Sequence, residues 1–388
     1  MLFNKKHKTL WLICGLLFVV ACGKQESLNK NEMIEQSKPT VESSNYILGA
    51  DISSLNELVD QGAVFIDTDG EEKTLPALLK NHGFNYIRLR TFVNPSADYG
   101  YAAGSCKRRE PKAESYNDKA HIIALAQQVK ALDMKLLLNF HYSDTWADPN
   151  HQVIPQAWRD LETIDELATA VKDYTIDVLT DMKAAGVIPD MVQVGNEITP
   201  GMLIHIPSKA SVCDGDGDGP MLEPTVNGST KNWQYLSSLL KAGIAGVKHV
   251  NSSTPIMLHI ENTGNREGLI HWVTQAVEHN VKFDVLGLSA YEKWQGPSNQ
   301  WQGTLNLLAN TFTELDFSIV EYNPQRKLLN NLMYNLPNER GLGTFFWEPV
   351  LSGEWGSSMF TQEGNVYTAK PEDFQVYDNL IKAYKLKP

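Results

Sequence analysis

Two glutamates stand at the carboxyl ends of short apolar segments. Glu197 lies in DMVQVGNEI (190–198), and Glu321 lies in DFSIVEYN (316–323). Segments this short and this rich in Val, Ile and Phe are typical of strands buried on both faces. A carboxylate at the end of a buried strand is costly unless it has a partner or a chemical role. Two of them at one end of a parallel sheet could cleave a glycosidic bond. The alternative is that each glutamate only pairs with a nearby arginine and holds its strand end.

The segments around these glutamates predict a single α/β domain. From residue 46 onward, eight strand-like runs alternate with segments that have helical spacing. The strand-like runs are 46–52, 86–93, 135–142, 191–197, 255–262, 285–292, 317–323 and 343–349. The helical segments are 75–82, 118–132, 162–185, 232–250, 268–279, 301–312 and 328–336. Strands that alternate with helices predict parallel strands joined by crossovers, and eight such units predict a (β/α)₈ TIM barrel over residues 46–388.

The loops of this predicted barrel are unequal in length. Segments that follow strands are long and rich in Trp, Tyr, Asp and Asn, as in 94–117, 143–160 and 199–231. In such barrels the loops at the carboxyl ends of the strands build the active site. The polar and aromatic residues at these strand ends are Asp51, Arg88, Arg90, Asn139, His141, Asp144, Asn196, Glu197, His259, Glu261, Ser289, Tyr291, Glu321, Trp347 and Glu348.

Several segments resemble a known family. GADISSL, IRLRTFVNP, HYSDTWADP, VQVGNEITPGML, GLSAY, IVEYN and GTFFWEP are similar to segments of glycoside hydrolase family 53, the endo-β-1,4-galactanases, from about residue 48 to about residue 384. HYSDTWADP and GNEITPGML are specific to that family, whereas the Asn-Glu pair alone indicates only clan A of retaining glycosidases. The resemblance implies a barrel enzyme that acts on galactan or galacto-oligosaccharides, with Glu197 as the acid/base and Glu321 as the nucleophile.

Other residues have expected roles in such a site. Arg90 and Tyr291 would keep the nucleophile ionised. Asn196 would donate to the sugar 2-hydroxyl, and Trp347 would form the floor of the subsite where cleavage occurs. Exposed indoles stack on the apolar faces of sugars, although buried packing is the alternative for Trp146, Trp294 and Trp355. The predicted substrate-binding set is Arg90, His141, Asp144, Trp146, Asn196, His259, Ser289, Tyr291, Trp294 and Trp347.

One departure from the family concerns the sixth strand. Members often carry two aromatic residues after its serine, whereas Ser289 is followed here by Ala290 and Tyr291. This difference affects the expected shape of a nearby subsite and leaves the expected chemistry unchanged.

The N-terminus has the pattern of a targeting segment. Three lysines precede the apolar stretch 10–21, which is too short to span a bilayer permanently and ends in VVAC at Cys22. Small residues before a cysteine resemble a bacterial lipoprotein signal, in which residues 1–21 would be removed and Cys22 lipidated. Residues 22–45 would then be a flexible polar tether to the cell envelope, at the outer membrane or cell surface. The alternative is a secretory signal cut nearby.

A second motif suggests a metal site. Asp214, Asp216 and Asp218 lie in DGDGDG, whose spacing matches the first half of a Ca²⁺ loop. The closing glutamate is absent, because Thr225 occupies position twelve, although Glu223 could substitute. We expect a structural Ca²⁺ here, and the alternative is a solvated acidic loop.

The two cysteines of the predicted domain, Cys106 and Cys213, fall in long loops after strands. They could form a disulfide in an oxidising compartment or remain as thiols.

Charge and composition limit the alternatives. The 388 residues carry a formal net charge of −12, which disfavours nucleic acid as a partner, and a neutral glycan fits without difficulty. We expect a monomer. The alternative enzyme is another retaining clan A endo-glycanase, such as a mannanase or cellulase. The alternative from a different class is a non-catalytic glycan-binding lipoprotein, which would usually have lost one of the two carboxylates.

Overall fold

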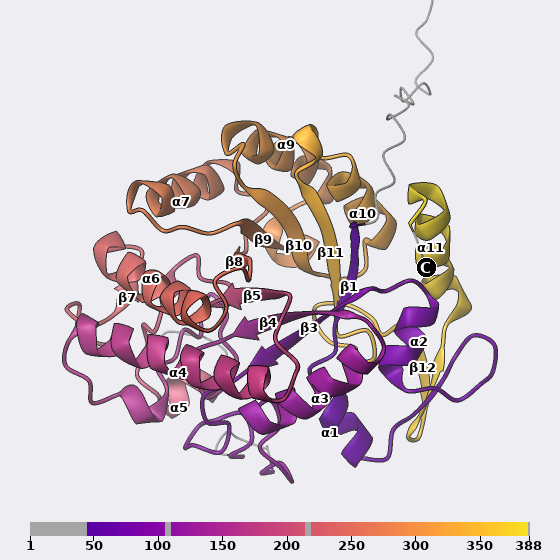
Figure 1. Cartoon of the computed structure of the whole chain (residues 1–388), viewed down its shortest axis with the longest axis horizontal. Helices are drawn as coiled ribbons and strands as arrows, with labels where there is room; N and C mark the ends of the chain where they lie inside the picture. The colour runs from indigo at the N-terminus through magenta and orange to yellow at the C-terminus, as the bar shows by residue number, and fades with distance from the viewer. Residues whose placement is uncertain (1–44, 105–109, 214–218, 387–388) are drawn as a thin grey trace, which may run out of the picture. The chain divides into compact units, whose positions relative to one another are not determined.

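The computed structural model describes residues 45–104, 110–213 and 219–386. Eight parallel strands form a closed barrel in the order β1-β11-β10-β9-β8-β5-β4-β3 (Figure 1). These strands are β1 (Ile47–Asp51), β3 (Tyr86–Thr91), β4 (Lys135–Phe140), β5 (Met191–Val194), β8 (Ile256–Ile260), β9 (Val285–Ala290), β10 (Asp316–Tyr322) and β11 (Gly341–Trp347). The predicted (β/α)₈ barrel is therefore confirmed, and all eight strands lie where the apolar runs placed them.

Helices surround the barrel (Figure 1). The seven predicted helices are present as α2 (Leu75–Asn81), α3 (Lys119–Ala131), α4 (Ile164–Ala184), α6 (Trp233–Val250), α7 (Arg266–Glu278), α9 (Trp301–Thr311) and α10 (Arg326–Tyr334). Local signals explain several starts: Thr163 and Glu166 form a capping box at α4, and Asp118 caps α3. The sequence analysis did not predict α1 (Leu55–Asp60), α5 (Lys209–Cys213), α8 (Glu292–Gln295) or α11 (Pro371–Tyr384).

Small sheets lie outside the barrel. β2 (Val64–Ile66), β13 (Val366–Ala369) and β12 (Phe360–Glu363) form a three-stranded sheet, and β6 (Gly201–Met202) pairs with β7 (Gly228–Ser229). The imidazole of His82 lies between two carboxylates, with Nε2 2.8 Å from Asp67 and Nδ1 2.9 Å from Asp378. These contacts join α11 to α2 and to the turn after β2.

In the described residues no helix is both long and apolar enough to cross a membrane.

The barrel interior changes from apolar to polar along the strands. Its apolar part is a separate cluster that includes Tyr86, Leu137 and Val320. Two residues further along β3 and β4, on the same strand faces, stand Arg88 and Asn139. The polar side chains therefore gather toward the carboxyl ends of the strands, where barrel enzymes carry their sites.

A β-bulge brings Glu321 to this polar end. Strict alternation would place Glu321 on the opposite face from Val320, which belongs to the interior cluster. The pairing of β10 with β9 shifts its register between Ile319 and Glu321. Because a bulge adds one residue to a strand, two consecutive side chains can serve the same side of the sheet. The irregularity thus directs both Val320 and Glu321 toward the barrel axis.

Some predictions concern residues that the structure does not describe. They are the signal and tether in residues 1–44, Cys106, and the three aspartates of the calcium motif, Asp214, Asp216 and Asp218. Cys213, which is described, is disulfide-bonded. Among the described ranges, no cluster of three or more His, Cys, Asp or Glu residues could hold a metal ion.

Candidate active site

A cavity of about 820 Å³ is lined by both predicted catalytic glutamates. Its other lining residues come from the segments that follow the barrel strands. They include Trp146, Asn196, Glu261, Tyr291, Trp294, Trp347 and Trp355. A cavity that combines aromatic side chains with a few carboxylates is suited to a sugar, which has apolar ring faces and polar edges.

Glu321 lies beside a buried arginine. Its Oε1 is 2.8 Å from Nη1 of Arg88, and the same nitrogen is 3.1 Å from Oδ2 of Asp51. Arg88 and Asp51 are fully buried, and Glu321 is almost so. Burial raises the pKa of Glu321 to about 7, although the adjacent guanidinium opposes that shift by stabilising the charged carboxylate. Arg88 therefore provides the ion pair that a carboxylate nucleophile needs in its charged form.

Glu197 lies in a different environment. Its Oε1 is 2.5 Å from the hydroxyl of Ser289. Burial raises the pKa of Glu197 well above its ordinary value, and the negative charges of Glu321 and Glu261 raise it further. Its φ of +46° lies in the left-handed region, which is uncommon for a residue with a side chain and often marks a functional site. The environment favours the protonated form, as a general acid requires.

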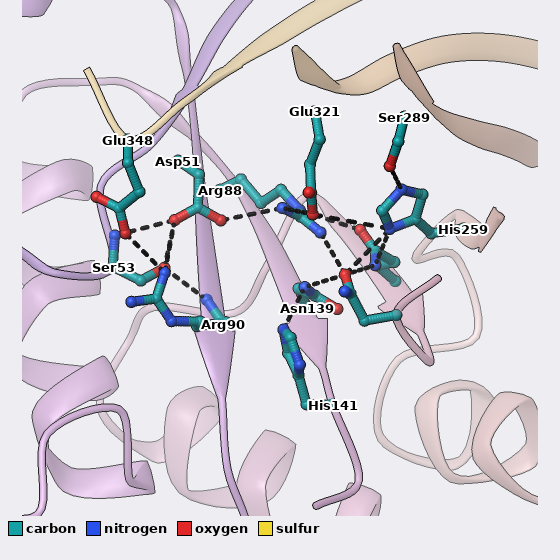
Figure 2. A network of polar contacts seen from close by, with 12 residues as sticks. Asp51, Ser53, Arg88, Arg90, Asn139, His141, His259, Ser289, Glu321 and Glu348 are labelled. Carbon is teal, nitrogen blue, oxygen red and sulfur yellow. Dashed lines mark hydrogen bonds and ion pairs between the residues drawn. The ribbon is translucent and has the colours of Figure 1, made fainter. Parts of the chain in front are cut away.

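Arg90 does not have the contact expected of it. Arg90 was expected to keep Glu321 ionised. Arg88 forms the ion pair, and the charge of Arg90 also lowers the pKa of Glu321, from a greater distance. Arg90 instead places Nη1 2.7 Å from Oε1 of Glu348, and its guanidinium lies 3.9 Å from the ring centroid of Trp146. Both arginines lie on one face of β3, two residues apart, so each reaches a different set of acceptors. Figure 2 shows Arg90 beside Glu348 and Arg88 directed toward Glu321.

Asn196 is held by several hydrogen bonds around its side chain. Its Oδ1 accepts hydrogen bonds from Nη2 of Arg88 at 2.7 Å and from Nδ2 of Asn139 at 2.9 Å. Its Nδ2 donates to the carbonyl of Ala147 at 2.8 Å, and Oδ1 also lies 3.0 Å from Nδ1 of His259. This fixes the orientation of the amide beside Glu197. Because Nδ2 has a second hydrogen, it can also donate to a ligand in the cavity.

The predicted substrate-binding residues divide into two groups. Those that line the cavity are Trp146, Asn196, Tyr291, Trp294 and Trp347. Those that lie behind the cavity wall, bonded to residues of the site or of its loops, are Arg90, His141, Asp144, His259 and Ser289. Because the second group does not line the cavity, its contribution is to position other groups.

Asp144 shows the role of this second group. Its Oδ1 accepts a hydrogen bond from the backbone nitrogen of Asn94 at 2.9 Å, and its Oδ2 accepts one from that of Gln156 at 2.8 Å. The carboxylate therefore joins the loop after β3 to the loop after β4. Burial raises the pKa of Asp144 to about 6, and the two backbone donors oppose the shift.

Two tryptophans show the range of aromatic surfaces in the cavity. Trp294 is 48% exposed, and Nζ of Lys293 lies over its ring 5.0 Å from the centroid, so the remaining exposed surface can stack on a sugar. Trp347 is buried and packs edge-to-face against Trp146, with ring centroids 5.8 Å apart. Trp294 is therefore the better candidate for a stacking platform.

Glu261 was predicted only as a polar strand end. It follows β8 and lines the cavity, and its Oε2 is buried without a hydrogen-bond partner. Burial raises its pKa to about 7. Tyr101 and Lys112 also line the cavity, from the loop after β3. The strand-end position could have identified Glu261, whereas nothing in the local sequence marks Tyr101 or Lys112.

The chain is similar to known proteins over most of its length. The family model described as glycosyl hydrolase family 53 matches residues 47–331. A Niallia circulans protein, "Uncharacterized protein in bgaB 5'region", is 35% identical and covers 83% of this chain and 89% of its own. The "Arabinogalactan endo-beta-1,4-galactanase" of Humicola insolens is 28% identical, with 83% and 96% covered.

Solved structures agree with this similarity. The "Ignisphaera aggregans GH53 catalytic domain" superimposes with a TM-score of 0.71 at 25% identity, covering 86% of this chain and 96% of that one. With a family model that matches most of the barrel and a relative above 30% identity, the resemblance predicted from the motifs is confirmed: this chain belongs to glycosyl hydrolase family 53.

Proposed function

We propose that this chain is an endo-acting β-1,4-galactanase that hydrolyses galactan and derived galacto-oligosaccharides with retention at the anomeric carbon. The observation that carries the proposal is the placement of Glu197 and Glu321 on one cavity with different neighbours. An arginine lies against Glu321, whereas burial and neighbouring carboxylates raise the pKa of Glu197 well above its ordinary value. The names of relatives from Humicola insolens and Bacillus subtilis support galactan as the substrate.

The proposed reaction is a double displacement. In the first step the Glu321 carboxylate attacks the anomeric carbon while Glu197 gives its proton to the leaving oxygen. In the second step Glu197, now a carboxylate, removes a proton from water, which attacks the same carbon and frees Glu321. Asn196 donates to the 2-hydroxyl of the sugar, a contact that strengthens in the transition state. Trp347 forms the floor of the cleavage subsite.

Incubation of the purified protein with galactan, mannan and cellulose tests the proposal. We expect galacto-oligosaccharides of several lengths to appear early from galactan, as endo-cleavage requires. NMR of the first products should show the β-anomer before mutarotation. Release from mannan or cellulose instead would favour another clan A endo-glycanase, and an initial α-anomer would exclude retention. A protein that binds galactan without cleaving it would be a glycan-binding module.

Two further proposals rest on the sequence alone. We propose that Cys22 is lipidated and anchors the domain to the bacterial cell envelope. The Cys22→Ala variant should move from the membrane fraction to the soluble fraction, and an unchanged distribution would contradict the anchor.

We also propose that a structural Ca²⁺ binds at Asp214, Asp216 and Asp218.

A further inference from the structure

Ser289 lies between the proposed acid/base and a buried histidine. Its Oγ is 2.5 Å from Oε1 of Glu197 and 2.9 Å from Nε2 of His259. Ser289 and His259 are fully buried. A serine hydroxyl carries one hydrogen, so it can donate to only one of these two neighbours at a time. Figure 2 shows the hydroxyl of Ser289 directed at the imidazole of His259.

The other nitrogen of His259 has both a donor and an acceptor within reach. Nδ1 is 3.0 Å from Oδ1 of Asn196, which accepts, and 3.2 Å from Nε2 of Gln193, which donates. The amide of Gln193 also lies 2.9 Å from the carbonyl of Gly195 and 3.1 Å from Oδ1 of Asn196. Burial and the charge of Arg88 hold the pKa of His259 well below its usual range, so the imidazole is neutral and carries one hydrogen.

One arrangement of hydrogens suits a protonated Glu197. The carboxylic acid donates to Ser289, whose hydroxyl donates to Nε2 of His259. Nδ1–H of His259 then donates to Oδ1 of Asn196. One amide hydrogen of Gln193 goes to Gly195, and the other shares Oδ1 of Asn196 with His259, Arg88 and Asn139, so four donors crowd this oxygen.

A second arrangement of the same heavy atoms suits an ionised Glu197. The hydroxyl of Ser289 turns and donates to the carboxylate, and His259 donates from Nε2–H to Ser289. Nδ1 is then bare and accepts from the amide of Gln193, which keeps its bond to Gly195. Asn196 still accepts from Arg88. Oδ1 of Asn196 then keeps only Arg88 and Asn139 as donors, so ionisation of Glu197 leaves no buried donor in this chain without a partner.

We propose that Ser289 and His259 form a hydrogen-bond switch that follows the protonation of Glu197, with the tautomer of His259 reporting the state. The inference rests on the acid/base role proposed above for Glu197. When Glu197 ionises, one proton is lost overall. The imidazole releases the hydrogen on Nδ1 and takes one up on Nε2 by exchange with water. His259 and Ser289 are thus positioning residues that give Glu197 a hydrogen-bond partner in both protonation states of a double displacement.

Other charged groups face the same region. They are Arg88 from β3, His141 after β4, Asp148 in the loop after β4, Glu261 after β8, Tyr291 after β9 and Glu321 from β10. Their charges set the pH at which Glu197 ionises. The switch itself depends on the single hydrogen that Ser289 shares between two neighbours.

The first test is ¹⁵N NMR of histidine-labelled protein, with the His259 signals assigned by their loss in His259→Asn. Below the pH at which kcat/KM falls on its basic side, His259 should carry its hydrogen on Nδ1. Above that pH it should carry the hydrogen on Nε2, with the same midpoint. One unchanged tautomer across this range, or a change at a different midpoint, would overturn the switch.

The Ser289→Ala variant tests the link through the hydroxyl. The tautomer of His259 should no longer change with pH, while Glu197 continues to titrate. The basic limb of kcat/KM should rise by about one pH unit, because the carboxylate loses a charge-assisted donor. A tautomer that still follows pH in this variant would contradict the proposal.

Ser318→Ala is the matched control. Ser318 is also a buried serine on a barrel strand, β10, but its hydroxyl donates to the carbonyl of Gly343 at 3.0 Å. Its pH profile and the His259 tautomer should match those of the wild type. The NMR titration requires no substrate, so it tests the switch separately from the proposed function. The tautomer can stay unchanged in a protein that hydrolyses galactan, and it can change in a protein that does not hydrolyse galactan.

Discussion

Arg88 is shared between Glu321 and Asp51: its Nη1 lies 2.8 Å from Oε1 of the first and 3.1 Å from Oδ2 of the second. Asp51 also lies 3.4 Å from Nη1 of Arg90, whereas Arg88 is the guanidinium in contact with Glu321. The negative charge of Asp51 raises the pKa of Glu321, against the effect of Arg88. The acidity of the proposed nucleophile thus depends on a residue at the end of the first strand, which does not line the cavity.

Asp51→Asn should therefore make Glu321 easier to ionise. The substitution removes a neighbouring negative charge, so the pKa of Glu321 falls. The nucleophile works only when ionised. The midpoint of the activity loss on acidification should therefore move to lower pH than in the wild type, by on the order of half a unit to one unit. The acidic limb of kcat/KM measures this shift. Asp316→Asn, at the opposite end of β10, is the control, and an acidic limb that moves upward would contradict the expected sign.

Glu197→Ala and Glu321→Ala should each lower kcat on galactan by about 10³-fold or more, since each removes a proposed participant in bond cleavage. Circular dichroism should show an intact fold. Added azide can take the place of the missing base in Glu197→Ala and should restore turnover with a β-galactosyl azide product. Near-normal activity in either variant would contradict the assignment, and an α-azide from Glu197→Ala would contradict retention.

Calcium should raise the melting temperature of the protein, if Asp214, Asp216 and Asp218 bind it as their spacing suggests. A ligand that binds only the folded state stabilises it by an amount set by its concentration relative to Kd. EDTA should lower the melting temperature and added Ca²⁺ should restore it. Asp216→Ala should remove this response, whereas Asp98→Ala, an exposed aspartate in another loop, should keep it. Equal melting temperatures with and without Ca²⁺ in the wild type would favour a solvated acidic loop.

The eight barrel strands could be predicted from the sequence because each is a short apolar run between helical segments. The small sheet of β2, β12 and β13 could not. Its strands have three or four residues each, and three consecutive residues of β12 are exposed. β2 is an apolar run of only three residues, β12 and β13 have no such run, and their pairing depends on contacts between distant parts of the chain.

The site could be predicted as a set of strand ends but not as a set of contacts. The sequence places both Arg88 and Arg90 near the nucleophile and does not show which one reaches it. The β-bulge in β10 is also invisible in the sequence, and without it Glu321 would point away from the barrel axis. A side chain can contact a sugar only if it lines the cavity, and the sequence does not show which side chains do. Ser289 and His259 were therefore predicted to bind substrate, although they lie behind the cavity wall.

Glu261→Gln should make the proposed acid lose its proton more easily. Glu261 lines the cavity, and its negative charge raises the pKa of Glu197. Its own pKa is about 7, so above neutral pH it carries the charge that Gln lacks. Removing that charge lowers the pKa of Glu197. A general acid works only while protonated. The midpoint of the activity loss on the basic side should therefore move to lower pH than in the wild type, by on the order of half a unit to one unit.

The pH dependence of kcat/KM separates this effect from a loss of stability. Glu267→Gln, an exposed glutamate on α7, is the control and should leave both limbs unchanged. The acidic limb of Glu261→Gln should stay close to that of the wild type, because Arg88 and Asp51 are the neighbours that chiefly set the charge of Glu321. An unchanged basic limb in a folded Glu261→Gln protein would show that Glu261 is too well screened to act on Glu197. A basic limb at higher pH would contradict the electrostatic argument itself.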